Sequence, residues 1–325
     1  MNPEGILVTG ANGFVGRALC RELAAAGYRV RGAVRAVPWV AGIASVEWHP
    51  VGDVGPDTDW RKALDGVGRV VHLAARAHVM KEPEADPLAV FRRVNAAGTA
   101  CLAAAAAQAG VRRLVLVSSV KVNGEASGAR PFGDDDAPHP QDPYAVSKWE
   151  AEQALWRVAR ESGMEAVVLR PPLVYGPGVK GNFHSLLKAV AAGVPLPLGA
   201  IRNRRSLVYL GNLTDALSLV LFDPRAAGRT FLVSDGEDLS TPDLVRRLAA
   251  ALGRRPRLIA VPVEVMQWAG KLLGKSDAVA RLVSSLTVEA SGLRTLLGWR
   301  PPFTLDQGLT ATAAWYRGAD PRQQL

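Results

Sequence analysis

The chain has 325 residues, of which 48% are hydrophobic and 21% are charged, and its 39 basic and 30 acidic side chains give a formal net charge of +9. This composition is typical of a folded protein, and the length indicates two domains or one large domain with an appendage. The 2 cysteines, Cys20 and Cys101, exclude a disulfide scaffold and a cysteine-ligated zinc site, and the 5 histidines are scattered, so we expect no metal. The basic excess leaves nucleic acid, a membrane surface or an anionic small ligand open as a partner.

The N-terminal sequence MNPEGILVTG lacks the basic stretch and long apolar segment of a secretory signal. No window approaches the ~18 uninterrupted apolar residues of a membrane span. We therefore expect a cytoplasmic protein with no integral membrane segment.

Short apolar runs alternate with helical patterns through the first half of the chain. The predicted strands are residues 6–9, 28–34, 45–48, 69–75, 113–118 and 166–169, and the predicted helices are residues 13–26, 86–110 and 142–162. Strands that are apolar throughout and separated by helices are typical of a parallel sheet covered on both faces. Residues 1–170 are thus predicted to form a doubly wound α/β (Rossmann) domain.

Proline and glycine become dense after Arg170, which indicates a smaller, loop-rich region over residues 171–325. Helices are predicted at residues 241–252 and 263–273. Apolar segments near 207–210 and 230–233 are expected to return to the first sheet, so the second region is predicted to interleave with the first near residues 205–235.

The segment TGANGFVG places Gly10, Gly13 and Gly16 between the first strand and the first helix. Gly10 permits a tight turn, Gly13 lets the backbone approach a pyrophosphate, and Gly16 lets the helix pack on the strand. The free N–H groups at the start of the helix then face the phosphates. A plain strand–helix turn is the alternative, but the βαβ pattern that follows favours a dinucleotide site. The predicted contacts from this loop are Gly10, Asn12, Gly13, Phe14, Val15 and Gly16.

The second strand indicates which dinucleotide is bound. NAD sites usually carry an acid ~20 residues past the glycines, but none occurs here between Glu22 and Glu47, and Arg35 follows the strand instead. An arginine there suits a 2′-phosphate, so NADP(H) is favoured and NAD(H) remains possible. Asp53, with its neighbour Val54, follows the third strand and is predicted to contact the adenine. A solvated Arg35 and a turn-forming Asp53 are the alternatives.

A candidate catalytic set lies at the end of the fifth predicted strand and the start of the helix that follows. Tyr144 and Lys148 are spaced i, i+4 and therefore share a helical face. A nearby ammonium group and an oxidised nicotinamide are expected to lower the pKa of the phenol, so that it exchanges a proton with a substrate alcohol or ketone. Ser118 and Ser119 end the strand, where ligands of doubly wound folds bind.

Several motifs together resemble the extended short-chain dehydrogenase/reductases that act on nucleotide sugars. They are TGANGFVG, HLAA, VNAAGT, SSVKVNGE, YAVSK and RPPLVYGPG, and they span nearly the whole chain. The resemblance selects Ser119 over Ser118 as the catalytic serine. It implies a homodimer formed through the helices near 89–109 and 144–160. It also implies a cofactor site completed by Leu73, Ala74, Ala75, Asn95, Tyr144, Lys148 and Pro171.

The same resemblance places Asn182 and Arg205 where family members hold the substrate diphosphate. Arg281 is a weaker candidate for that task, with a plain surface arginine as the alternative. Ser119 and Lys121 complete the expected substrate contacts. The amphipathic segment 262–275 is expected to pack on its own domain, although a membrane contact is the alternative.

The expected activity is NADPH-dependent reduction at C4 of a UDP-4-keto-6-deoxy-N-acetylhexosamine, for O-antigen synthesis. The family's dehydratases carry an Asp–Glu pair where this chain has Val120–Lys121, so dehydration is disfavoured. The alternative is a UDP-glucose or UDP-N-acetylglucosamine 4-epimerase that holds NAD tightly. A third hypothesis is a cofactor-sensing or nucleic-acid-binding protein. The intact Ser119, Tyr144 and Lys148 set and the lack of a concentrated basic run argue against it, so no nucleic-acid partner is expected.

Overall fold

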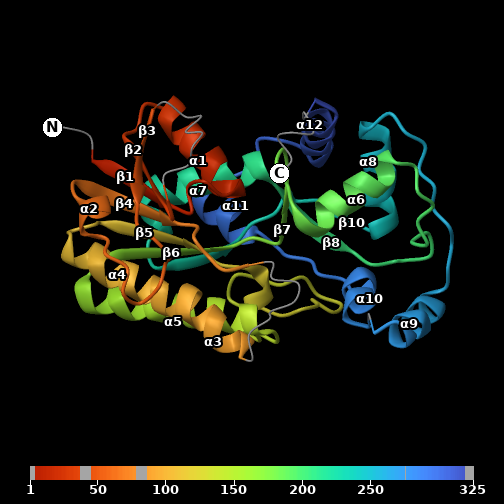
Figure 1. The fold of residues 1–325 in the computed structure, drawn as a ribbon, viewed down its shortest axis with the longest axis horizontal. Helices are drawn as coiled ribbons and strands as arrows, with labels where there is room; N and C mark the ends of the chain where they lie inside the picture. The colour runs from red at the N-terminus through yellow and green to blue at the C-terminus, as the bar shows by residue number, and fades with distance from the viewer. Residues whose placement is uncertain (1–3, 37–44, 78–85, 275, 319–325) are drawn as a thin grey trace.

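The computed structural model describes residues 4–36, 45–77, 86–274 and 276–318. Its centre is a seven-stranded sheet in the order β3-β2-β1-β4-β5-β6-β9 (Figure 1), and every neighbouring pair of strands is parallel. The doubly wound α/β prediction is confirmed. The strands are β1 (Gly5–Thr9), β2 (Val30–Val34), β3 (Val46–Pro50), β4 (Val67–His72), β5 (Arg113–Val117), β6 (Glu165–Arg170) and β9 (Arg229–Leu232).

Helices cover both faces of this sheet (Figure 1), so the central strands β1, β4, β5 and β6 are buried almost throughout. One face is covered by α1 (Phe14–Ala25), α7 (Leu210–Phe222) and α11 (Ser291–Leu297). The other face is covered by α2 (Arg61–Leu64), α4 (Gly98–Gln108) and α5 (Pro143–Ser162). The long helix predicted at 86–110 is divided into α3 (Pro87–Phe91), the π-helical segment η1 (Arg92–Ala97) and α4.

A smaller sheet of three strands in the order β10-β8-β7 lies beside the first. Its strands are β7 (Leu173–Tyr175), β8 (Arg205–Tyr209) and β10 (Asp238–Leu239). It shares a hydrophobic core with α6 (Gly181–Ala191), α8 (Thr241–Ala251) and α12 (Leu305–Gly318). The helices α9 (Val263–Leu272) and α10 (Ser276–Val283) lie together at the far end from β1 (Figure 1). Two short 3₁₀ turns, η2 (Val120–Val122) and η3 (Pro224–Ala226), complete the elements.

The C-terminal half returns to the first sheet, but not at both expected places. Strand β9 pairs with β6, as expected for residues 230–233. Strand β8, expected in the same sheet, pairs instead with β7 and β10. The division of the chain into domains at residue 170 stays a prediction.

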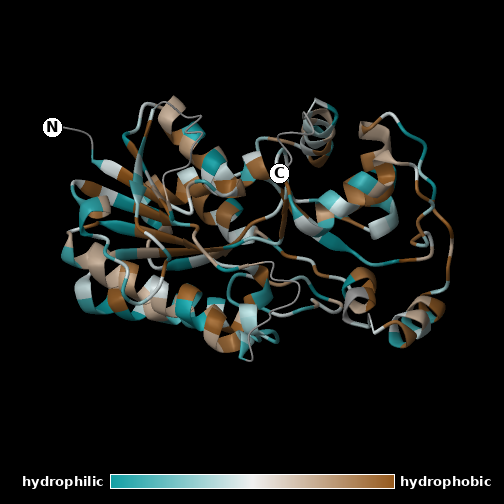
Figure 2. Ribbon diagram, viewed as in Figure 1, coloured by the Kyte–Doolittle hydropathy of each residue, from teal (hydrophilic) through white to brown (hydrophobic). Residues whose placement is uncertain are grey.

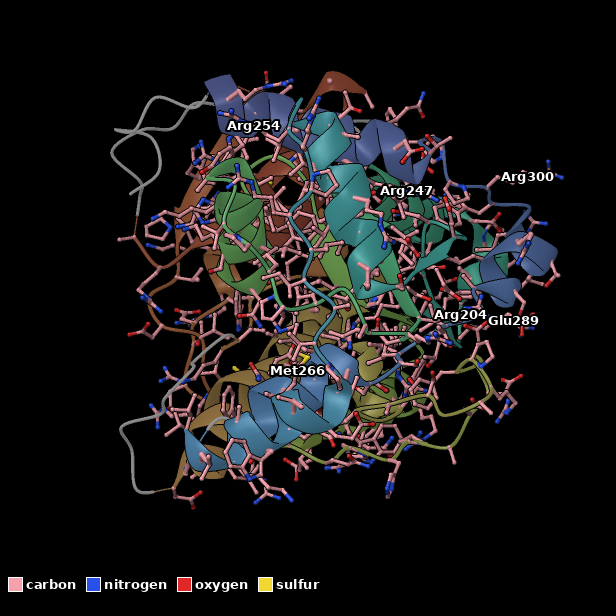
Figure 3. The ribbon with its side chains drawn as sticks, turned by 90° about the vertical axis from the view of Figure 1, so that its right-hand side faces the viewer. Arg204, Arg247, Arg254, Met266, Glu289 and Arg300 are labelled. Atoms are coloured by element: carbon pink, nitrogen blue, oxygen red, sulfur yellow. The ribbon has the colours of Figure 1, made fainter. Side chains whose placement is uncertain are left out.

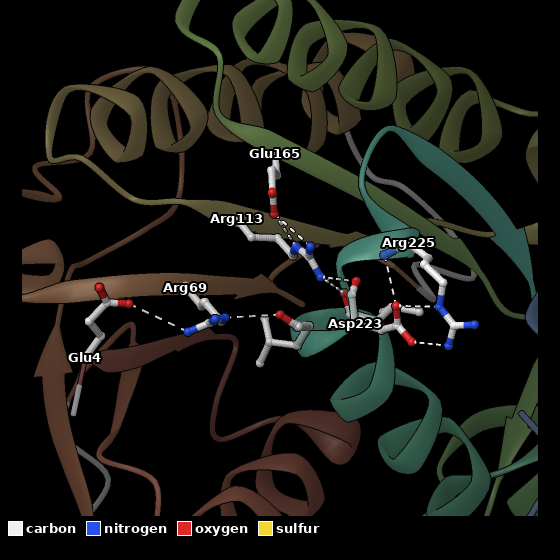
Figure 4. A network of polar contacts seen from close by, with 8 residues as sticks. Glu4, Arg69, Arg113, Glu165, Asp223 and Arg225 are labelled. Atoms are coloured by element: carbon white, nitrogen blue, oxygen red, sulfur yellow. Dashed lines mark hydrogen bonds and ion pairs between the residues drawn. The ribbon is translucent and has the colours of Figure 1, made fainter. Parts of the chain in front are cut away.

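The amino-terminal end of the parallel sheet is held by buried polar contacts, whereas the carboxyl end carries loops. At the amino-terminal end, the buried Arg113 pairs with Glu165 at 2.7 Å and donates to the carbonyl oxygens of Val220 and Asp223 at 2.8 and 2.6 Å (Figure 4). These bonds tie the end of α7 to β5 and β6. The carboxyl end carries the loops that follow β1, β4 and β5, and the strand order reverses between β1 and β4, which is where doubly wound sheets bind ligands. None of the helices in the described ranges is long and apolar enough to cross a membrane.

Candidate functional site

The glycine loop after β1 admits only glycine at two positions. Gly10 has φ of +63°, and a Cβ there would lie 2.9 Å from the backbone nitrogen of Ala74. A Cβ on Gly16 would lie 2.2 Å from the carbonyl oxygen of Gly10. The first glycine therefore makes the turn beside the loop after β4, and the third lets α1 begin directly against that turn.

The start of α1 is open to an anion. Gly13 is the N-cap in an extended conformation, it provides no side-chain cap, and no acid occupies the first turn. The N–H groups of Phe14 and Val15 thus face outward at the positive end of the helix dipole, with Asn12 exposed beside them. A helix start of this kind, behind a loop that only glycine can form, fits the pyrophosphate of a dinucleotide.

A buried polar chain, which sequence analysis missed, holds the loop after β4 against β1. His72 is 1% exposed, and burial, with Lys148 nearby, lowers its pKa to about 3, so the ring is neutral. The Thr99 hydroxyl donates to the Asn95 carbonyl at 2.5 Å, so it accepts from Nε2 of His72 at 3.1 Å. Nδ1 therefore accepts from the Thr9 hydroxyl at 2.6 Å.

The Thr9 oxygen in turn accepts from the backbone nitrogens of Leu73 and Ala74, each at 3.1 Å. This fixes the HLAA segment, with Ala75 exposed, next to Gly10. Of the residues that the resemblance assigned to the cofactor site, Leu73 and Ala74 thus lie directly against the glycine loop.

Two of the predicted adenosine contacts meet at the ends of β2 and β3. Nε of Arg35 lies 2.5 Å from Oδ1 of Asp53, and the two side chains are 79% and 82% exposed. Val54 packs against α4, where a Cβ on Gly98 would lie 2.7 Å from its Cγ1. Strand β2 is followed by Arg35 and not by an acid, and among the described residues Asp53 is the carboxylate that pairs with this arginine.

The structure brings Ser119, Tyr144 and Lys148 together. Ser119 follows β5 and caps η2, and its side chain is hydrogen-bonded to that of Tyr144 in the first turn of α5. Asp142 begins this helix by accepting from the Ala145 nitrogen at 2.6 Å, which fixes where Tyr144 emerges. Lys148 is 1% exposed and donates from Nζ to the Val117 carbonyl at 2.8 Å. Burial lowers the pKa of Lys148 to about 8.

The protein groups around Tyr144, taken by themselves, raise the pKa of its phenol. Burial raises it to about 12, the hydrogen bond from Ser119 acts in the opposite direction, and the Asp142 carboxylate raises it further. Lys148 does not offset these effects, because its ammonium group is directed to the Val117 carbonyl. At neutral pH the phenol is therefore protonated and can donate a proton to an adjacent oxygen.

A second buried network that sequence analysis missed lies directly behind this set. Glu152 follows Lys148 by one helical turn, is fully buried, and forms a bidentate pair with Arg170 at 3.0 and 2.6 Å. The Ser118 hydroxyl donates to the same carboxylate, and Arg170 also donates to Oδ1 of Asn123 at 3.1 Å. The i, i+4 spacing of Lys148 and Glu152 was the available signal. The network joins β5, α5 and β6 next to Ser119.

Asn95, in the π-helical turn, bridges the loop after β4 and helix α5. Its Oδ1 accepts from the Arg76 nitrogen at 2.8 Å, and its Nδ2 donates to the Arg76 carbonyl at 3.1 Å and the Ser147 hydroxyl at 2.9 Å. It therefore holds the loop after β4 against α5. Pro171 is buried beyond β6, where its carbonyl accepts from the Val120 nitrogen at 3.0 Å.

The expected substrate contacts are in different environments. Lys121 lies between Glu125, at 2.9 Å, and Asp142; burial lowers its pKa, but these two carboxylates raise it more. Arg205 is half-buried and donates to the carbonyl oxygens of Arg281 and Ser284, at 2.8 and 3.2 Å.

The guanidinium of Arg205 forms no ion pair with another described residue. Burial lowers its pKa, against the attraction of Glu125. A half-buried cation without a carboxylate partner suits an anionic ligand. The side chain of Asn182, in the first turn of α6, and that of Arg281 are exposed. Within the described ranges, no three His, Cys, Asp or Glu residues are grouped so that they hold a metal ion.

Comparisons with known proteins agree with the fold. Residues 6–234 match the model of the NAD dependent epimerase/dehydratase family. The chain is 46% identical over 324 residues to a UDP-glucose 4-epimerase of Vibrio cholerae, covering 98% of each chain. It is 28% identical to the N-acetyl-alpha-D-glucosaminyl-diphospho-ditrans,octacis-undecaprenol 4-epimerase of Escherichia coli O157:H7, covering 95% of this chain and 94% of that one. Among solved structures, MoeE5 in complex with UDP-glucuronic acid and NAD superposes with a TM-score of 0.79 at 27% identity, over 96% of this chain and 99% of that one.

Proposed function

Because the chain belongs to the NAD-dependent epimerase/dehydratase family, we propose that it is a short-chain dehydrogenase/reductase that transfers hydride at C4 of a UDP-sugar. We further propose that its main reaction is NADPH-dependent reduction of a UDP-4-keto-6-deoxy-N-acetylhexosamine. The observation that carries this choice is Arg35, a cation at the end of β2 in place of the acid that usually binds NAD.

The catalytic roles follow from the geometry around Tyr144. Its phenol, held protonated by burial, gives its proton to the oxygen at C4 as that oxygen becomes an alkoxide. Ser119, hydrogen-bonded to Tyr144, orients the carbonyl oxygen of the substrate. Lys148 binds the cofactor ribose from its buried position beneath Val117. NADPH, when bound along the glycine loop, supplies the hydride.

The diphosphate of the substrate is assigned to Arg205. Its guanidinium is half-buried, has no carboxylate partner among the described residues, and already bonds the carbonyls at the end of α10. Asn182 and Arg281 are proposed as secondary contacts, and Lys121 as a substrate contact that its two carboxylates hold in place. An O-antigen role, a homodimer through α4 and α5, and a cytoplasmic location remain predictions.

Replacing Arg35 with aspartate is expected to reverse the cofactor preference. The variant loses the cation that pairs with a 2′-phosphate and places a second carboxylate next to Asp53, which repels that phosphate. We expect kcat/KM with NADPH to fall by about tenfold or more, and kcat/KM with NADH to hold or rise. Steady-state kinetics with both cofactors measure this. Equal efficiency of the unmodified enzyme with NADH would contradict the preference.

The second candidate is a UDP-glucose or UDP-N-acetylglucosamine 4-epimerase, favoured by the 46% identity to the Vibrio cholerae enzyme. In that reaction the same three residues oxidise C4 and then reduce it from the other face. An epimerase retains its cofactor, so it needs none added.

Incubation of purified protein with UDP-N-acetylglucosamine or UDP-glucose, without added cofactor, separates the two candidates. We expect no galacto epimer by nuclear magnetic resonance or chromatography, and consumption of NADPH with the 4-keto-6-deoxy substrate. Formation of the epimer without added cofactor would establish the epimerase instead.

A further inference from the structure

Helix α9 exposes a continuous apolar stripe. Val265, Trp268 and Leu272 are spaced i, i+3, i+7 and so lie on one side of the helix, and Leu273 follows directly. Their exposed fractions are 50%, 65%, 65% and 70%. The opposite side of the helix, with the buried Gly270 and the half-buried Met266, faces the protein. One side of α9 therefore packs on its own domain, as expected, and the other side is exposed. Figure 2 shows hydrophobic colouring along α9 at the outer end of the molecule.

Folded proteins seldom expose several large apolar side chains side by side unless the surface binds something. We call Val265, Trp268, Leu272 and Leu273 the α9 stripe. Trp268 is the most informative member, because an exposed indole combines a large apolar body with a polar N–H, a combination favoured at interfaces.

Basic side chains accompany the α9 stripe. Residues 253–283 contain six basic and two acidic residues. Besides Arg281, which is assigned to the substrate, four of the basic side chains are exposed and form no ion pair with another described residue: Arg254, Arg255, Arg257 and Lys271. Figure 3, which looks onto this end of the molecule, shows Arg254 near its upper edge and Met266, which belongs to α9, in its lower half. This end thus combines apolar area with unpaired positive charge.

We infer that the α9 stripe docks the protein on an anionic lipid bilayer. Tryptophan and leucine enter the boundary between headgroups and acyl chains, while exposed arginine and lysine are attracted to anionic headgroups. Attachment is peripheral, through one face of one helix. A symmetric contact with a second copy is disfavoured, because it would bring the same unpaired cations of both copies into one interface.

Sedimentation with vesicles tests this inference on the full chain. We expect binding to vesicles of phosphatidylglycerol and phosphatidylcholine, little binding to phosphatidylcholine alone, and a decrease with added salt. Trp268→Glu should weaken binding by about tenfold or more, because it removes apolar area and adds a negative charge.

Gln267→Glu is the matched control, since it adds the same charge at an exposed neighbouring position of α9 without removing an apolar side chain. It should keep most of the binding. Leu272→Ser with Leu273→Ser, which adds no charge, should lose binding as Trp268→Glu does.

Three outcomes would overturn the inference: no vesicle binding at low salt, equal binding by Trp268→Glu and the unmodified chain, or conversion of an oligomer to a monomer by Trp268→Glu. The last would identify the stripe as an interface between copies. Vesicle binding is measured without substrate or cofactor, so its result is independent of the proposed reaction. Unchanged turnover of a water-soluble substrate by Trp268→Glu would show that the variant is folded.

Discussion

Replacing Tyr144 with phenylalanine is expected to lower kcat by about 10²- to 10⁴-fold, the range that general acid catalysis by one side chain contributes. The change removes one oxygen atom and leaves the ring in its edge-to-face contact with Phe91, at 6.1 Å between centroids. The half-buried position of the phenol and the Ser119 hydrogen bond both act on that oxygen atom, so its removal tests them directly. Steady-state kinetics, with cofactor affinity measured by fluorescence titration, test the prediction.

The control is Tyr316→Phe, the same change on α12, where no other described residue is hydrogen-bonded to the phenol oxygen. It should leave kcat within about twofold of the unmodified enzyme, as expected for a surface substitution that removes no buried bond. If Tyr144→Phe weakened cofactor binding and raised KM but left kcat unchanged, Tyr144 would be a binding residue and another group would supply the proton.

The parts of the site that sequence predicted are those that depend on short stretches of chain. Gly10 and Gly16 are required by the turn between β1 and α1, so their spacing alone indicates the loop. Tyr144 and Lys148 share a helical face for the same local reason. The boundaries of α5 were also predictable, because Asp142 caps its start and Gly163, with φ of +76°, ends it.

The parts that sequence missed depend on contacts between distant segments. Arg170 on β6 pairs with Glu152 on α5. The i, i+4 spacing of Lys148 and Glu152 was the one local signal, and it did not indicate that Arg170 is the partner, since charged side chains are normally exposed. The small sheet illustrates the same point for the fold. Strand β8 is apolar enough for either sheet, and only its tertiary partners β7 and β10 decide which one it joins.

The surroundings of Tyr144 depend on tertiary contacts in the same way. The i, i+4 spacing places Lys148 on the correct face, but it does not determine where the ammonium points. In the structure Nζ donates to the carbonyl of Val117, the last residue of β5, which lies far from Lys148 in the sequence.

Replacing Arg170 with methionine is expected to destabilise the protein by about 3–5 kcal/mol, because the fully buried Glu152 carboxylate loses its ionic partner. Arg170 is 3% exposed and donates three hydrogen bonds within the network, so water does not compensate for its loss. A lower midpoint of unfolding in urea measures the effect. Arg225→Met is the control: it breaks a pair with Asp223 in which the arginine side chain is 56% exposed, so the midpoint of unfolding should change little.

The double variant Glu152→Leu, Arg170→Met tests whether the buried pair positions Ser119 in addition to stabilising the fold. Removing both charges of a buried pair is often neutral, so the double variant should recover much of the stability that Arg170→Met alone loses. Its kcat should nevertheless stay low, because the Ser118 hydroxyl loses its acceptor and the end of β5 is no longer held against α5 beside Ser119. A double variant with normal kcat and normal KM would show that the pair stabilises the fold without positioning the catalytic serine.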